Sequence, residues 1–265
     1  YTATASNVTF GLPGYANRNN EGAIESTVSA NNDLGFSIVK YVATGVTATV
    51  GHGLDTPAEM IIAKTTNQAY GWVVYHKDLG ATNLMSLDSS NASASSSAFM
   101  NSTSPTSSVF TAGAGQNLNY ANNDQIVAYC FTSKRGVSKV GSYTGTGATG
   151  NKVYTGFEPA FVIVKRTNGT GNWMMHDNKR SANNGDGQDL VLYSDLNNSE
   201  DQYSSGGLTF DNDGFTINVT STSANLNNSN YIYYAVSKNT NETQLADTVG
   251  FKPSIDPDDH FNTVT

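Results

Sequence analysis

Residues 36–77 of the chain read FSIVKYVATGVTATVGHGLDTPAEMIIAKTTNQAYGWVVYHK, and residues 138–179 read SKVGSYTGTGATGNKVYTGFEPAFVIVKRTNGTGNWMMHDNK. The two stretches correspond in order. Tyr41 corresponds to Tyr143 at an offset of 102 residues, and Trp72 corresponds to Trp173 at an offset of 101 residues. An offset that drifts so little indicates a tandem duplication with small insertions in loops. Each unit has the size of an independent domain, so the repetition predicts two domains and not the coils of a solenoid.

The composition and the short apolar runs predict an all-β fold. Only 14% of the residues are charged, and the chain contains 14 Tyr and 11 Phe; ordinary soluble domains are roughly 25% charged. Strand-length runs such as MIIAK, WVVYH and FVIVK are separated by Gly, Asn, Ser and Thr, a pattern typical of a sandwich or barrel. We therefore predict two tandem, duplicated β-sandwich domains.

The repeat also divides the chain into segments. The expected divisions are an N-terminal arm or linker (1–33), a first β-sandwich repeat (34–135), a second repeat (136–240), and a C-terminal extension or start of a further unit (241–265). The serine-rich tract SSNASASSS at 89–97 is predicted to be a long surface loop, where duplicated domains diverge.

Four aromatic residues form the structural signature of the repeat: Tyr41, Tyr143, Trp72 and Trp173. Both tryptophans begin runs that are apolar at consecutive positions, WVVYH and WMMH, so both faces of these strands are expected to be covered. We interpret Trp72 and Trp173 as core residues. The alternative is an exposed indole that stacks on a sugar ring, as in lectins.

Charge and cysteine content exclude several classes of protein. The net charge of −8, without a basic cluster, is unsuited to binding nucleic acid, which needs Lys and Arg to neutralise phosphates. It also disfavours anionic membranes, and no run approaches the roughly 18 apolar residues of a membrane span. The single cysteine, Cys130, precludes an intramolecular disulfide and favours assembly in a reducing cytoplasm. It lies in the run IVAYCF and is predicted to be a buried, inert side chain.

The sequence contains no recognisable catalytic or cofactor motif, and the expectation is a protein without enzymatic activity and without a cofactor. The four histidines lie at no metal-binding spacing: His52, His76, His176 and His260. His76 and His176 end the paired tryptophan runs, so capping or packing roles are expected. Four aspartates in Gly- and Asn-rich turns resemble calcium loops: Asp186, Asp189, Asp211 and Asp213. Ordinary Asx-rich turns are the alternative for these residues.

Several phrases of the repeat are similar to a known domain. FSIVKY, TVGHGL, WVVYHKDL, SSSAFMNSTSPTSSVFT, SKVGSYTGTG, VYTGFEPAFVIVKR and YIYYA resemble a β-domain recurrent in structural proteins of marine tailed phages, especially cyanophages. The resemblance covers about residues 34–239. In that family the domain occurs in long virion proteins, tail fibres and related appendages, and no established catalytic residues exist to carry over.

The resemblance implies a non-enzymatic virion structural protein of the tail-fibre, appendage or capsid-decoration type, which engages the host cell surface. The alternative is a carbohydrate-binding module or a fragment of a polysaccharide depolymerase. Because sheet edges need to be paired, covered or charged, and this chain has few charges, we expect a homo-oligomer, with a trimer favoured for a fibre. The other expected partners are virion proteins and a host surface glycan. The expected location is the virion, assembled in the host cytoplasm and exposed extracellularly.

Overall fold

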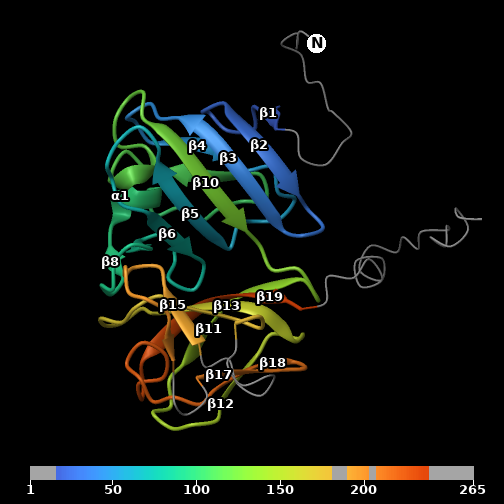
Figure 1. The fold of residues 1–265 in the computed structure, drawn as a ribbon. Coiled ribbons are helices and arrows are strands. Elements are labelled where there is room, and N and C mark those ends of the chain that lie inside the picture. Colours follow the sequence, from blue (N-terminus) through green and yellow to red (C-terminus); the bar gives the residue numbers. More distant parts are fainter. Residues whose placement is uncertain (1–15, 181–189, 203–206, 239–265) are drawn as a thin grey trace, which may run out of the picture.

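The computed structural model describes residues 16–180, 190–202 and 207–238. The fold is nearly all β, with 45% of residues in strands and 3% in helices, which confirms the predicted all-β class. The strands form four sheets. Two of them use strands β1–β10 and two use strands β11–β19, and we call these groups the N-terminal and the C-terminal sheet pair (Figure 1).

The N-terminal sheet pair consists of an eight-stranded and a two-stranded sheet. The order of the large sheet is β1 (Asn17–Asn19), β2 (Ser26–Asn31), β3 (Phe36–Val42), β10 (Gln125–Phe131), β5 (Met60–Thr65), β6 (Val73–His76), β7 (Asn83–Ser86) and β8 (Ala94–Ser95). The small sheet pairs β4 (Ala48–Gly51) with β9 (Val109–Ala112), and two short helices lie nearby, α1 (Ser97–Met100) and the 3-10 helix η1 (Gln116–Leu118).

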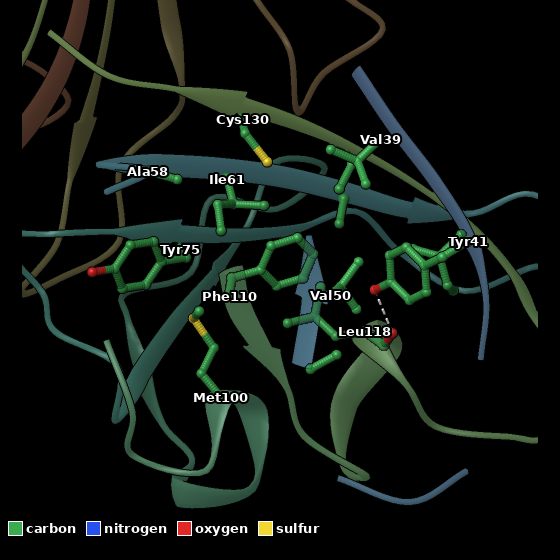
Figure 2. Close-up of a cluster of buried hydrophobic side chains, with 14 of the residues drawn as sticks. Val39, Tyr41, Val50, Ala58, Ile61, Tyr75, Met100, Phe110, Leu118 and Cys130 are labelled. Atoms are coloured by element: carbon green, nitrogen blue, oxygen red, sulfur yellow. Dashed lines mark hydrogen bonds between the residues drawn. The ribbon is translucent and has the colours of Figure 1, made fainter. Parts of the chain in front are cut away.

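The core of the N-terminal pair lies between its two sheets and α1. Strand β3 alternates, so that Val39 and Tyr41 point into this core while Ile38 points outward. Figure 2 shows Phe110 of β9 in the middle of the cluster and the Tyr41 hydroxyl directed at the Leu118 carbonyl, to which it donates a hydrogen bond of 2.6 Å.

Cys130 belongs to this core, as predicted from its apolar run. Its side chain is completely buried, and burial raises the pKa of its thiol to about 12, with a hydrogen bond to Ser37 opposing the effect. The neutral thiol is a poor nucleophile. Cys130 is therefore a small packing residue.

The C-terminal sheet pair consists of a six-stranded and a three-stranded sheet. The order of the large sheet is β11 (Ser138–Thr144), β19 (Asn230–Ser237), β13 (Pro159–Arg166), β14 (Met174–Asp177), β15 (Leu190–Tyr193) and β16 (Asp201–Gln202). The small sheet has the order β12 (Asn151–Tyr154), β18 (Gly214–Ile217) and β17 (Leu208–Asp211). Their core includes Val162 and Val164 of β13, Phe215 of β18 and Tyr233 of β19.

The segment predicted to be an N-terminal arm contains two strands of the large N-terminal sheet. Strand β2 pairs antiparallel with β3 over its whole length, from Ser26 opposite Tyr41 to Asn31 opposite Phe36, and β1 pairs with β2. Val28 of β2 is buried in the core. The prediction failed because β2 is rich in small polar residues, so its alternation is faint, and the ladder hydrogen bonds come from a neighbouring strand. The predicted C-terminal extension, 241–265, lies outside the described residues.

Candidate functional site: the interface between the sheet pairs and the face beside it

The two large sheets pack against each other through apolar parts of the faces that point away from their own cores. On β5, Ile61 points into the N-terminal core, whereas Met60 and Ile62 belong to a third cluster. On β13, Val162 points into the C-terminal core, whereas Ile163 belongs to the third cluster. This shared core comprises buried Met60, Val74, Met85, Val140, Ile163, Trp173 and Ile232, with partly buried Ile62, Leu79, Leu87, Phe131, Phe161, Met175 and Tyr234 packed against them.

Trp173 anchors the shared core. Its side chain is 1% exposed. The indole Nε1–H donates to the Ser86 carbonyl of the N-terminal pair at 2.8 Å, and its backbone N–H donates to Asp195 Oδ1 at 3.1 Å. Nearby, the rings of Phe131 and Tyr234 meet across the interface at 4.8 Å between centroids. A buried indole with its N–H satisfied combines a large apolar area with a fixed orientation, so Trp173 fixes how the two pairs sit.

The polar part of the interface is formed by residues 86–93, which start at the last residue of β7. We call them the bridging segment. Its Ser90 carbonyl accepts from the Gly171 N–H at 2.9 Å, and its Ser93 N–H donates to the Thr167 carbonyl at 2.9 Å. The Leu87 carbonyl accepts from Ser194 Oγ at 3.0 Å. Three residues of the serine tract predicted to be a long surface loop, Ser90, Asn91 and Ser93, thus contact the C-terminal pair. The end of the tract belongs to β8 and α1 of the N-terminal pair.

The Lys165 side chain binds the backbone of the bridging segment. Its ammonium group donates to the carbonyls of Ser90 (3.2 Å), Asn91 (2.8 Å) and its own neighbour Arg166 (3.0 Å), and the residue is 0% exposed. Burial lowers the pKa of Lys165 to about 8, opposed by the Asp195 carboxylate and reinforced by the Arg166 charge. Three carbonyls match the three donors of an ammonium group, so this buried lysine is a structural clamp.

A cleft of about 590 Å³ opens beside the shared core, between the two sheet pairs. Its walls are mostly apolar and include Phe36, Phe131 and Met175, with Ser194 and Tyr234 among the few polar groups. Burial raises the pKa of Tyr234 to about 12, with a hydrogen bond to Ser138 opposing the effect. The phenol is therefore a neutral hydrogen-bonding group at neutral pH, and the cleft is suited to apolar surface.

Beyond the cleft, the outer face of the large N-terminal sheet continues without cover from any other described residue, and we call this surface the open face. It comprises outward-pointing residues of β3, β10 and β5 together with the tryptophan before β6: Ile38, Lys40, Val42, Lys64, Trp72, Val127 and Tyr129. The Tyr129 ring stacks between Phe36 (6.5 Å, 6° between planes) and Trp72 (6.4 Å, 27°). Aromatic rings in a row on a sheet face are a typical contact surface.

His52, His76 and His176 are buried, which agrees with the packing roles expected for His76 and His176. The His76 side chain is buried, and its Nδ1 accepts the Asp78 N–H at 3.2 Å. His52 is also buried, between the Thr106 carbonyl (3.0 Å from Nε2) and the Leu54 N–H (3.1 Å from Nδ1), and burial lowers its pKa. Within the described ranges, no group of three or more His, Cys, Asp or Glu side chains could hold a metal ion. His260 lies outside those ranges.

Of the four candidate calcium ligands, Asp211 and Asp213 flank the turn between β17 and β18. The Lys152 ammonium group lies 2.6 Å from Asp211 Oδ2 and 2.7 Å from Asp213 Oδ1, and Thr216 Oγ1 donates to Asp211 Oδ2 at 2.7 Å. Both carboxylates are thus bound to a cation that the chain itself supplies. Asp186 and Asp189 lie outside the described residues.

The four signature aromatics lie at corresponding places. Tyr41 and Tyr143 are on β3 and β11, and each contacts the core of its own pair. Trp72 and Trp173 directly precede β6 and β14. The core role expected of both tryptophans fits Trp173 fully, whereas Trp72 is only half-buried on the open face. Lys165 and the bridging segment were not predicted from the sequence. The buried lysine left a weak signal, since it directly ends one of the most apolar runs of the chain, AFVIVK.

Comparisons with known proteins give one match. A search of the curated proteins and a search of the solved structures each find nothing similar. In the part of the chain that the structure describes, no helix has the length and apolar character that a membrane crossing requires. A family model described as a domain of unknown function (DUF7483) matches residues 11–240, a range that includes every strand of both sheet pairs. The chain therefore belongs to the DUF7483 family.

Proposed function

We propose that the two sheet pairs are tandem β-sandwich domains produced by duplication, with the boundaries expected from the sequence. The order of the strands supports this. The sequence β3-β10-β5-β6-β7-β8 in one large sheet has the same connectivity as β11-β19-β13-β14-β15-β16 in the other. In each set of six, the last strand along the chain lies between the first two: β10 between β3 and β5, and β19 between β11 and β13.

Local details at corresponding positions also support the duplication. Tyr41 donates to the Leu118 carbonyl at 2.6 Å, and Tyr143 donates to the Ala224 carbonyl at 2.7 Å. The next residue in each acceptor segment is an asparagine, whose side-chain oxygen accepts the N–H of Thr44 or Thr146 at 2.7 and 2.8 Å. The glycines that follow these threonines have φ of 74° and 68°, a conformation that other residues rarely adopt.

If the domains are duplicates, the hydroxyls of Tyr41 and Tyr143 should contribute equally to the free energy of unfolding. Tyr41→Phe and Tyr143→Phe each leave a buried carbonyl without its donor, so each is expected to lower the free energy of unfolding by about 1–3 kcal/mol. Urea unfolding followed by circular dichroism measures both. A large loss in one variant and none in the other would contradict the equivalence of the two positions.

For the function of the whole chain, we propose a non-enzymatic structural subunit of a phage virion, of the tail-fibre, appendage or capsid-decoration type. The observation that carries the proposal is the shared core. Two domains joined by a buried Trp173, a clamped Lys165 and apolar sheet faces form one stiff body, because a packed interface resists hinge motion. Such a stiff body is suited to a structural subunit of a virion, which has to transmit force. Its low charge and the contact surface on one side are suited to packing against other subunits. The resemblance to phage appendage domains supports the same role.

This proposal is tested by locating the chain. Antibody fragments raised against the purified protein should label intact particles from a lysate of the source culture at a fixed, repeated position in electron micrographs. The chain should also be retained after the particles are purified on a density gradient. Finding it in the infected-cell lysate but not in the purified particles would contradict a virion role.

The second candidate function is a carbohydrate-binding module acting on a host surface glycan. The ring row of Phe36, Tyr129 and Trp72 on the open face favours it, because aromatic faces stack on sugar rings. Titration of the protein with host polysaccharide in a calorimeter tests this candidate. A saturable heat of binding that is lost in the Trp72→Ala variant would support this candidate. The absence of any heat of binding would count against it.

A further inference from the structure

Corresponding positions on the two large sheets differ in whether anything covers them. In the C-terminal pair, Trp173, Lys165 and Val140 are 1%, 0% and 0% exposed. Their counterparts by strand register in the N-terminal pair are Trp72, Lys64 and Ile38. Trp72 and Lys64 are only half-buried, and Ile38 is 39% exposed. The open face is thus the uncovered counterpart of a face that is buried elsewhere in the same chain.

The bridging segment, together with the residues of the N-terminal pair in the shared core, covers the face around Trp173. Strand pairing identifies its counterpart in the C-terminal pair. Val74 opposes Met85 on β6 and β7, and Met175 opposes Leu192 on β14 and β15. The counterpart of the bridging segment is therefore 193–200, which we call the tail segment. Its last five residues, 196–200, are exposed. Among the described residues, the N-terminal pair thus has a face that nothing covers, and the C-terminal pair has a segment of the covering type whose last five residues are exposed.

We propose that the open face binds the tail segment of a second copy of this chain, head to tail. In such a contact Trp72, Ile38 and the stacked Tyr129 would be buried as Trp173 and its neighbours already are within the chain. Leu196, which is 40% exposed, would lie at the edge of the buried surface. The inference rests on the duplication proposed above.

The charges at the two ends are complementary. The open face has the exposed Lys40 and the half-buried Lys64, and Asp201, which directly follows the tail segment, is exposed. Glu200, the last residue of the tail segment, forms an ion pair with Arg180 of its own chain. Opposite charges favour the encounter of these two surfaces over the pairing of two open faces, which would bring lysines together. The contact joins unlike surfaces, so it closes into a ring or continues as a filament. A three-membered ring has this kind of interface and agrees with the trimer expected for a fibre.

Two variants and their mixture test the head-to-tail contact. Ile38→Glu places a charge on the open face, and Leu196→Glu places one on the tail segment. Both residues are exposed, so each variant should unfold at the wild-type temperature in circular dichroism. Val46→Glu, at an exposed position of the loop between β3 and β4 that belongs to neither surface as defined, is the matched control. We expect the wild type and the control to form species larger than 28.1 kDa in light scattering as concentration rises, and each of the other variants to associate at least about 10-fold more weakly.

The mixture gives the decisive result. Ile38→Glu keeps an intact tail segment, and Leu196→Glu keeps an intact open face. Mixed in equal amounts, the two variants should therefore form a one-to-one dimer, twice 28.1 kDa in mass, and nothing larger. A wild type that stays monomeric would overturn the proposal, as would a mixture that stays monomeric. Glycan binding at the open face of a monomeric wild type would overturn it in favour of the carbohydrate-binding module. A virion location without self-association would leave the proposed function intact while refuting this inference.

Discussion

Trp173→Ala is expected to lower the free energy of unfolding by about 3–5 kcal/mol, the usual range for removing a buried aromatic side chain. The indole is 1% exposed and bonds the Ser86 carbonyl across the interface. Its loss leaves both a cavity in the shared core and a carbonyl without its donor. We also expect one cooperative urea transition to separate into two, because the shared core is the coupling between the sheet pairs. Circular dichroism at increasing urea measures both effects.

Trp72→Ala is the matched control, since the same side chain is removed from the corresponding position. Trp72 is half-buried, and its described ring contact is the stack on Tyr129, which is worth about 0.5–1.5 kcal/mol. We expect a loss of about 1–2 kcal/mol and a single transition. Equal losses for the two variants would mean that the interface between the pairs contributes little to stability.

Acid is expected to destabilise the protein through His76 well before the carboxylates titrate. Burial lowers the pKa of His76 from 6.5 to about 4, and the nearby Asp78 carboxylate opposes part of this effect. Because the pKa is lower in the folded protein than in the unfolded chain, the unfolded chain takes up the proton first as pH falls. The stability that His76 contributes is complete above pH 6.5 and is lost as pH falls toward 4. Linkage gives a loss of about 2 kcal/mol between pH 7 and pH 5.

His76→Gln tests the assignment. The amide can still accept the Asp78 N–H and does not titrate, so the drop in unfolding free energy between pH 7 and pH 5 should shrink by about 2 kcal/mol relative to the wild type. A smaller drop should remain, because burial also lowers the pKa of His52. Urea unfolding at the two pH values measures the difference. An unchanged pH dependence would show that His76 is protonated without cost in the folded state.

The local pattern of the sequence determined which residues are strands and which strands are covered on both faces. MIIAK and FVIVK became β5 and β13, each with one set of side chains in its own core and the other in the shared core. WVVYH predicted a strand buried on both faces, and β6 is buried throughout. These properties depend on side-chain alternation within a few residues, which a sequence displays directly. The apolar setting of Cys130 predicted its burial for the same reason.

Only the tertiary structure decided whether a residue is buried or exposed when the same residue type occurs at corresponding positions of the two sheet pairs. Trp72 and Trp173 begin similar apolar runs, yet one is half-buried on the open face and the other anchors the shared core. The difference comes from the bridging segment, whose contacts with Lys165 and Gly171 join residues about 75 to 80 positions apart. Strand β2 likewise depends on ladder bonds from β3 and not on its own weak pattern. The sequence by itself therefore determined the strongly apolar strands and their two-sided burial, because these follow from the local side-chain pattern. The partner of each face was decided by contacts between distant segments, which no local pattern encodes.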